Sequence, residues 1–218
     1  MVKGIFLRRK SRRLAEIEID GCVYEAYMSN GSEIGFLTPG SVCYLREAEN
    51  IRRTAYDFYS IYDADTLVCV DAKEPLRVAG KWLPERLEEE LNIERLKFYE
   101  DSRISTLFSL GDYKMMIQVM GTSLVNERKA YLPEIPSRIL NQRLDDLIIG
   151  KDLWDNIRLL LVTCRDDADY FAANREADPE FADLLECVRD EDIPIECLRC
   201  KVDKDGMKPD KMIPVMFE

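Results

Sequence analysis

The sequence predicts two domains of mixed α and β structure, spanning the α+β and α/β classes: a small β-barrel over residues 1–80 and an α/β domain over residues 81–218. Three observations predict this division. About five short strand patterns crowd into the first part. A helical pattern, a hairpin and a continuous apolar strand follow in the second part. The charge also changes, because residues 1–60 contain nine Lys and Arg against eight Asp and Glu, whereas residues 61–218 contain 22 against 34.

The barrel is expected from its strand patterns. Ala15, Ile17 and Ile19 alternate with acidic residues, and Asp20-Gly21 follows as a hairpin turn. Further strands are expected over residues 22–28, 41–46, 55–62 and 66–71. Short strands in this number favour a barrel of the oligonucleotide-binding (OB) type. Aromatic residues on these strands are candidates for stacking on bases, although core packing is the commoner role of each: Tyr24, Tyr27, Tyr44, Tyr56, Phe58, Tyr59 and Tyr62.

A basic cluster distinguishes the barrel from the rest of the chain. The net charge of −11 argues against a polyanionic partner, but the local distribution allows one. The candidate phosphate-binding residues are Arg8, Arg9, Lys10, Arg12, Arg13, Arg52 and Arg53. The alternative is a solvated basic edge that binds nothing, since such charges also prevent strands from aggregating.

The composition excludes several classes of protein. With 46% hydrophobic and 33% charged residues the profile is that of a globular protein, and we expect neither a membrane span nor a signal peptide, hence a cytoplasmic location. Seven cysteines without a regular framework predict free, buried thiols. Cys197 and Cys200 have the spacing of a zinc knuckle, but on a strand they point to opposite faces and no second pair accompanies them. The absence of histidine excludes imidazole chemistry.

The elements of the second part are predicted from periodicity and capping. Residues 71–82 are expected to link the two domains, and an amphipathic helix is expected to open at Pro84, with Glu94 as a candidate carboxylate. The apolar run from Ile157 to Cys164 predicts a buried central strand. A helix from Asp178-Pro179 to Val188, a strand over residues 195–201 and a turn at residues 205–206 complete the pattern.

The stretch from Ser102 to Leu124 predicts a β-hairpin. Residues 109–112 form its turn, and the strand from Met115 to Met120 would place Met116, Gln118 and Met120 on one face. The alternation alone does not say what that face does.

Short motifs in serial order give the chain a resemblance. It contains SNGSEIGFLTPG, VCVDAKEP, SRI, IQVMGTSL, YLPE and IPIECLRC, and in this order it resembles the sugar fermentation stimulation protein A family. The resemblance implies an OB-like barrel joined to a restriction-endonuclease-like domain of the PD-(D/E)XK type. Such domains bind Mg²⁺ through an aspartate on one strand and the glutamate of a Glu-x-Lys motif on the next.

The resemblance also shows what this chain lacks. The three motif positions are occupied by Ser105, Gln118 and Met120, and most of a Thr-x-Arg-Gly-x-x-His-Leu motif is missing from residues 137–144. We therefore expect no catalytic residue, no metal and no cofactor, and favour a protein with a degenerate nuclease site that binds nucleic acid, most simply DNA. A homodimer is compatible with the sequence.

Two alternatives remain open at this point. Carboxylates could have relocated and rebuilt a Mg²⁺ site in an active nuclease, the candidates being Asp101, Asp112, Glu127, Asp145 and Asp146. In the other alternative, the chain is a protein-interaction or small-ligand module that does not bind nucleic acid.

Overall fold

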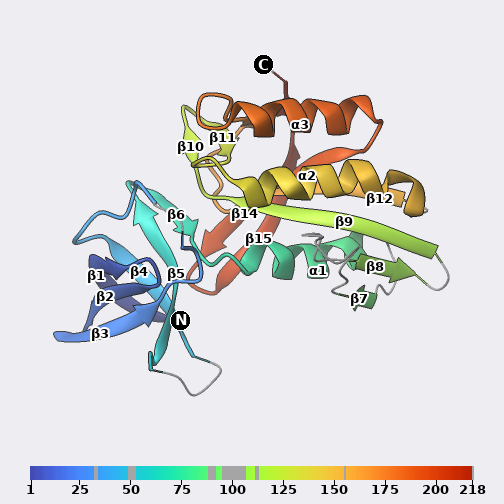
Figure 1. The fold of residues 1–218 in the computed structure, drawn as a ribbon. Helices are drawn as coiled ribbons and strands as arrows, with labels where there is room; N and C mark the ends of the chain where they lie inside the picture. The colour runs from blue at the N-terminus through green and yellow to red at the C-terminus, as the bar shows by residue number, and fades with distance from the viewer. Residues whose placement is uncertain are drawn as a thin grey trace.

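The protein consists of a β-barrel beside a mixed α/β domain (Figure 1). The computed structural model describes residues 1–31, 34–48, 53–87, 92–94, 107–110, 113–154 and 156–217. The barrel domain contains β1 (Val2–Ser11), β2 (Leu14–Ile19), β3 (Cys22–Tyr27), β4 (Val42–Glu47), β5 (Tyr56–Asp63) and β6 (Thr66–Cys69). It is followed by α1 (Glu74–Leu87), β7 (Asn92–Glu94), β8 (Leu107–Leu110), β9 (Tyr113–Thr122), β10 (Val125–Asn126), β11 (Lys129–Leu132), α2 (Arg138–Gly150), a 3₁₀ turn η1 (Lys151–Leu153), β12 (Asn156–Thr163), β13 (Tyr170–Ala173), α3 (Pro179–Asp190), β14 (Ile195–Asp203), β15 (Gly206–Ile213) and β16 (Val215–Met216).

The barrel closes through one parallel pairing. The strands follow the order β3-β2-β1-β4-β5, and β3 also pairs with β5 through Ala26 and Tyr27, which turns five strands into a ring. Alternate side chains fill the interior, among them Phe6, Ile17 and Phe58, each at most 1% exposed. This is the OB-like barrel that the strand count predicts.

The predicted barrel strands are confirmed, but β1 is missing from the prediction. In this strand Gly4 and Phe6 point inward while Arg8 and Lys10 point outward. These four residues have the same parity, so the alternation is broken between Phe6 and Arg8, where the pairing with β2 shifts its register. This irregularity and the cations that follow it hid the strand in the sequence. Gly4 is required where it lies, because a Cβ atom there would meet the side chain of Ile17.

The predicted linker and helix start were wrong. Residues from Glu74 onward form α1, whose first turn contains Pro75, and Pro84 lies inside this helix rather than at its beginning. Glu94 lies on β7 and not on a helix. The helix forms here because Val78, Ala79 and Leu83 make one apolar stripe that is buried against the sheet.

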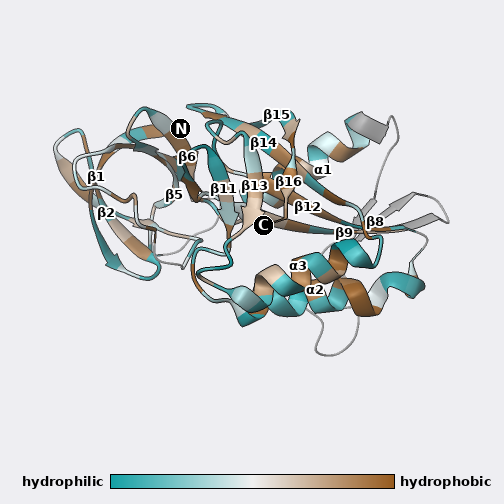
Figure 2. Cartoon of the chain, turned by 90° about the horizontal axis from the view of Figure 1, so that it is seen from above, coloured by the Kyte–Doolittle hydropathy of each residue, from teal (hydrophilic) through white to brown (hydrophobic). Residues whose placement is uncertain are grey.

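The α/β domain is built on a six-stranded sheet in the order β15-β14-β12-β9-β8-β7. β9, β12 and β14 are parallel, and the other neighbours are antiparallel. α2 and α3 cover one face of this sheet and α1 covers the other (Figures 1 and 2). These helices bury apolar side chains against the sheet, among them Leu144 and Leu147 of α2 and Phe181 and Leu185 of α3.

The remaining predictions for this domain are largely confirmed. β8 and β9 pair as the expected hairpin, β12 is the buried central strand, and α3 begins at Pro179 with Asp178 as its N-cap. Cys197 packs on the α2–α3 face and Cys200 on the α1 face, as the strand geometry requires. All seven cysteines are free, but Cys22 and Cys187 are exposed, so burial was wrongly predicted for these two.

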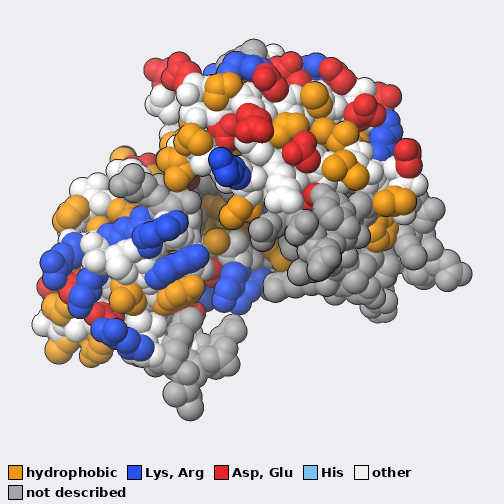
Figure 3. Space-filling model, viewed as in Figure 1, with side chains coloured by type: hydrophobic (Ala, Val, Ile, Leu, Met, Phe, Trp, Pro, Cys, Tyr) orange, Lys and Arg blue, Asp and Glu red, His pale blue; other side chains and the backbone are white. Residues whose placement is uncertain are grey.

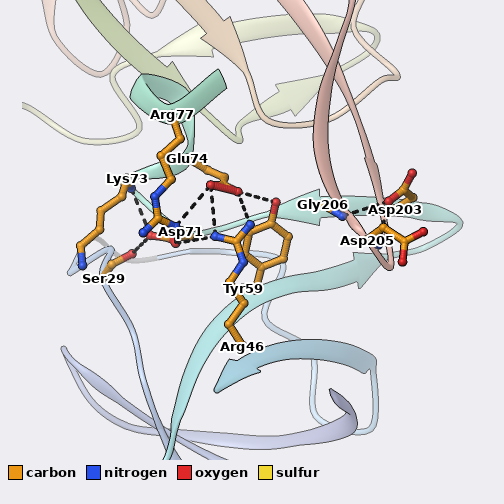
Figure 4. A network of polar contacts seen from close by, with 10 residues as sticks. All are labelled: Ser29, Arg46, Tyr59, Asp71, Lys73, Glu74, Arg77, Asp203, Asp205 and Gly206. Atoms are coloured by element: carbon orange, nitrogen blue, oxygen red, sulfur yellow. Dashed lines mark hydrogen bonds and ion pairs between the residues drawn. The ribbon is translucent and has the colours of Figure 1, made fainter. Parts of the chain in front are cut away.

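The two domains meet through a polar network on one side of their junction (Figure 4). Arg46 on β4 donates to both oxygens of Glu74 on α1, with Nη1–Oε1 and Nη2–Oε2 distances of 3.1 and 2.6 Å. The hydroxyl of Tyr59 on β5 donates to Glu74 Oε2 at 2.7 Å, and the Arg46 guanidinium lies 4.0 Å from the centre of the Tyr59 ring. Burial alone would raise the pKa of Glu74, but these hydrogen bonds hold that pKa below its usual value.

Candidate functional site

A cleft of about 650 Å³ adjoins the polar network at Asp71 and lies where the barrel, the end of β9 and the beginning of α2 meet. The barrel side contributes Arg12, Asn30 and residues 69–72, and α1 contributes Pro75 and Leu76. The α/β domain contributes residues 119–123, 132–140, Arg143 and Cys164. The cleft therefore lies at the carboxyl end of a sheet strand and between two domains, both frequent locations of binding sites.

The face of β9 that carries the motif positions Gln118 and Met120 leads to this cleft. Met116, Gln118 and Met120 lie on one face of the strand, as predicted, and that face packs beneath α2 and α3. Met120 lines the cleft and is 2% exposed. The predicted position Ser105 lies outside the described residues.

Gln118 is a polar side chain in an apolar layer. It is 1% exposed, and its Oε1 atom is buried without a hydrogen-bond partner among the described residues. Its Nε2 atom donates to the carbonyl oxygen of Val119 at 3.1 Å. A buried acceptor without a partner costs about 1–3 kcal/mol. This residue is therefore not explained by its contribution to stability.

Two carboxyl groups line the cleft, and both have partners. Asp71 Oδ1 accepts from Ser29 Oγ at 2.8 Å and from the backbone N–H of Lys73 at 3.1 Å. Glu134 Oε1 accepts from Ser123 Oγ at 2.9 Å. Burial raises the pKa of Glu134, and the Ser123 hydroxyl offsets this only in part. Asp71 is therefore held in place by two hydrogen bonds, whereas Glu134 is held by one and binds its proton more tightly than an ordinary glutamate.

Three arginine side chains line the same cleft. They are Arg12 from the β1–β2 loop, Arg138 from the first turn of α2, and Arg143 one and a half turns further along α2. Arg12 Nε donates to the carbonyl oxygen of Gly31 at 3.4 Å, a contact that leaves its charge uncompensated. Arg138 makes no side-chain hydrogen bond or ion pair with the part of the chain that the structure describes. The cleft is therefore electropositive.

The cluster predicted to bind phosphate lies on the barrel surface (Figure 3). Lys10 on β1 and Arg53 in the β4–β5 loop approach the same carboxylate, that of Glu25 on β3, at 2.5 and 3.4 Å. Arg8 is paired with Glu16 on β2 at 2.6 Å. These carboxylates hold the β1 end and the β4–β5 loop together, so that the cations form one surface. Arg52 lies outside the described residues.

Other predicted cations donate to backbone carbonyl groups. Arg9 Nη2 donates to the carbonyl oxygen of Arg12 at 2.8 Å, and Arg13 donates to that of Ser29. A carbonyl oxygen positions a guanidinium without removing its charge. Arg12 belongs both to this cluster and to the lining of the cleft, so the basic surface continues into the cleft.

The candidate stacking residues separate into two groups. Phe58 and Tyr59 are buried, and their packing role is settled by that burial. Tyr24 is 40% exposed and lies edge-to-face against Tyr56, with ring centres 5.6 Å apart.

The residues at the motif positions do not fit a hard divalent cation. Mg²⁺ and Ca²⁺ select carboxylate oxygens, whereas Gln118 offers a neutral carboxamide and Met120 a thioether. The described residues contain no group of three or more His, Cys, Asp and Glu side chains able to hold a metal ion. Of the relocated carboxylates considered above, Glu127, Asp145 and Asp146 do not line the cleft, while Asp101 and Asp112 lie outside the described residues.

Sequence reasoning named Arg12 but missed the other two cleft arginines, Arg138 and Arg143, and also Gly121. A Cβ atom at Gly121 would overlap the ring of Pro75, so only glycine lets α1 lie this close to the end of β9. Arg138 and Arg143 were passed over because α2 was not predicted as a helix. The available signal for the helix was Ser137, which caps its N-terminus.

No helix among the described residues is long and apolar enough to cross a membrane.

Comparison with known proteins identifies the family. The model described as "Sugar fermentation stimulation protein RE domain" matches residues 74–206, and that described as "SfsA N-terminal OB domain" matches residues 7–70. Sugar fermentation stimulation protein homologues of Desulfitobacterium hafniense and Ruminiclostridium cellulolyticum are 26% and 25% identical, each over 98% of this chain, and 95% and 96% of their own lengths are covered. The structure of Pyrococcus furiosus SfsA in complex with Ca²⁺ matches with a TM-score of 0.88 at 19% identity, over 99% of this chain and 95% of that one. The chain belongs to the sugar fermentation stimulation protein family.

Proposed function

We propose that this protein binds nucleic acid, DNA in the first instance, along the basic surface of the barrel and into the cleft, without hydrolysing it. The observation that supports this most directly is the position of Arg12, which joins the basic cluster to the cleft. In OB barrels the β1–β2 and β4–β5 loops commonly contact oligonucleotides. Here these loops carry Arg12, Arg13 and Arg53.

The absence of hydrolysis follows from the chemistry of the motif positions. The Pyrococcus furiosus relative is described in complex with Ca²⁺. In this chain the corresponding strand presents Gln118 and Met120, which supply neither anionic ligands nor an ammonium group. We therefore propose a degenerate nuclease-like site. A cytoplasmic location is part of this proposal and is supported by the free cysteines.

A second candidate is a metal-dependent nuclease with relocated carboxylates. Its support is that Asp71 and Glu134 both line the cleft. Against it, Asp71 already accepts two hydrogen bonds, and Glu134 holds its proton more tightly than an ordinary glutamate. The remaining alternative is a protein-interaction or small-ligand module.

Salt dependence tests the nucleic-acid proposal. The side chains of Arg8 and Arg53 are 67% and 77% exposed, so Arg8→Gln with Arg53→Gln removes two charges without disturbing the core. Affinity for a labelled DNA duplex, measured by fluorescence anisotropy, should fall steeply with salt. In the double variant the slope of log affinity against log salt should decrease by about 2.

A matched control uses two arginines on the α/β domain. Arg175 and Arg189 are 43% and 45% exposed and are ion-paired, as Arg8 and Arg53 are. Arg175→Gln with Arg189→Gln should leave the slope unchanged. An absence of binding at low salt would instead support the interaction-module alternative.

Restoration tests the degenerate site. The triple variant Ser105→Asp, Gln118→Glu and Met120→Lys recreates the acid, acid and lysine pattern. Calorimetric titration should detect Mg²⁺ or Ca²⁺ binding to the triple variant and none to the unmodified protein. Identical titrations for both would contradict the placement of these motif positions.

A further inference from the structure

We propose that the cleft binds the phosphorylated end of a DNA strand and does so without a metal ion, using the guanidinium groups of Arg12, Arg138 and Arg143. This inference rests on the function proposed above and names the part of the DNA that the cleft would receive. The geometry that supports it is the convergence of three arginines from the barrel and α2 on one cavity.

The charge of the cleft fits a terminal phosphate better than an internal one. Against the three guanidinium groups stand Asp71 and Glu134. Asp71 lies within 4 Å of the guanidinium groups of Arg46 and Arg77 from the polar network, and so its charge is largely compensated. A terminal phosphate monoester carries more negative charge near neutral pH than a diester does, and guanidinium groups bind phosphate oxygens through paired hydrogen bonds.

The floor of the cleft favours a strand end over a strand that passes through. α1 and β9 are in such close contact at Gly121 that no side chain fits between this residue and Pro75. Met120 and Cys164, which are 2% and 5% exposed, close the rest of the cleft floor. A phosphate that enters from the barrel side therefore meets a closed floor, as the end of a strand would. The volume of about 650 Å³ lies within the range of pockets that hold small ligands, and one terminal nucleotide is of that size class.

One wall of the cleft supplies apolar contact. Ile135 and Ile139 are 47% and 54% exposed, although both are large aliphatic residues. They lie beside Arg138 at the beginning of α2 and line the cleft together with Leu140 and Pro136. Exposed apolar side chains beside cations suit a ligand with a flat apolar body and an anionic group, as a nucleotide has.

Oligonucleotides that differ only in their ends test this inference. Short single-stranded DNAs of one sequence, internally labelled and carrying a 5′-phosphate, a 3′-phosphate or hydroxyl groups at both ends, are titrated with the protein in EDTA. We expect one phosphorylated form to bind about tenfold more tightly than the hydroxyl form. The variant Arg138→Gln should abolish this difference, because it should weaken binding of the phosphorylated form about tenfold more than binding of the hydroxyl form. Arg175→Gln, which removes a charge away from the cleft, should keep the difference.

The outcomes separate the two proposals. If no oligonucleotide binds, the function proposed above fails. If all three bind equally and Arg138→Gln weakens none selectively, the barrel binds DNA and the strand-end inference alone is overturned. Thymidine monophosphate serves as a competitor, and we expect it to act only at far higher concentration, because it lacks the barrel contacts. Competition at the concentration of the oligonucleotide would assign the cleft to free nucleotides and also overturn the inference.

Discussion

The polar network and the cleft, which form the closed and the open side of the domain junction, hold their carboxyl groups in opposite ways. On the closed side, Glu74 receives hydrogen bonds from Arg46 and Tyr59, and its pKa is lowered. On the open side, Glu134 receives one hydrogen bond from Ser123, and its pKa is raised. The first arrangement stabilises the fold, whereas the second reduces stability at neutral pH. The cleft side has therefore kept groups that folding alone does not favour, which is a common property of binding sites.

The largest expected effect is on the closed side. Glu74→Gln removes the carboxylate that binds Arg46 at 2.6 Å in a largely buried position and leaves Arg46 only the more distant Asp71, at 3.8 Å. We expect the free energy of unfolding to fall by about 3 kcal/mol, the magnitude typical of a broken buried ion pair. Urea unfolding measures this. Glu85→Gln, on an exposed position of the same helix, is the control and should change it by less than about 0.5 kcal/mol. Equal effects of both substitutions would remove the distinction between the two sides of the junction.

Lowering the pH should erase the contribution of Glu74. Because its folded-state pKa lies below the usual 4.5, its stabilisation is fully present above that pH and is lost as the pH falls through the folded-state pKa. The difference in unfolding free energy between the unmodified protein and Glu74→Gln should thus shrink below pH 4.5. A difference that stays constant down to pH 3 would show that the carboxylate charge is not what stabilises this side.

Gln118 provides the next effect, on the sheet face that leads to the cleft. Gln118→Met removes a buried oxygen without a hydrogen-bond partner and keeps nearly the same volume. Thermal and urea unfolding should show a gain of about 1–2 kcal/mol. A loss of stability would mean that the carboxamide is satisfied in the folded protein, and Gln118 would then have a structural role.

The smallest effect is expected at Glu134. Glu134→Gln should raise the free energy of unfolding by about 1 kcal/mol at pH 7, because a neutral side chain avoids the burial of a charge. The gain should disappear below pH 4.5, where Glu134 is protonated in both folded and unfolded states. Destabilisation at pH 7 would place Glu134 among the groups that hold the junction together.

The fold could be predicted from the sequence wherever burial follows a local period. Ile17 and Ile19 on β2, the apolar run of β12 and the Asp178-Pro179 start of α3 are of this kind. α1 was misplaced because a proline suggested a helix start at Pro84, while the true start also contains a proline, Pro75. Two equivalent signals cannot be ranked without knowing which residues the sheet buries.

The site could be predicted only in part. Strand alternation predicts that Met116, Gln118 and Met120 share one face of β9. The identities of Gln118 and Met120 show that this face lacks the charged residues of the family motif. The cleft could not be predicted from the sequence, because residues far apart in the chain, such as Arg12 and Arg138, line it together. Only the packing of the barrel against the α/β domain brings them to one cavity.

Plasmid cleavage, measured together with binding, tests whether the protein binds DNA without cleaving it. Supercoiled DNA is incubated with the protein at low salt in EDTA, Mg²⁺ or Mn²⁺, and each sample is analysed for retardation and for nicked or linear product. We predict retardation under all three conditions, weakened by salt, and no cleavage in any of them. Metal-dependent cleavage by the unmodified protein that disappears in Gln118→Met would contradict the account.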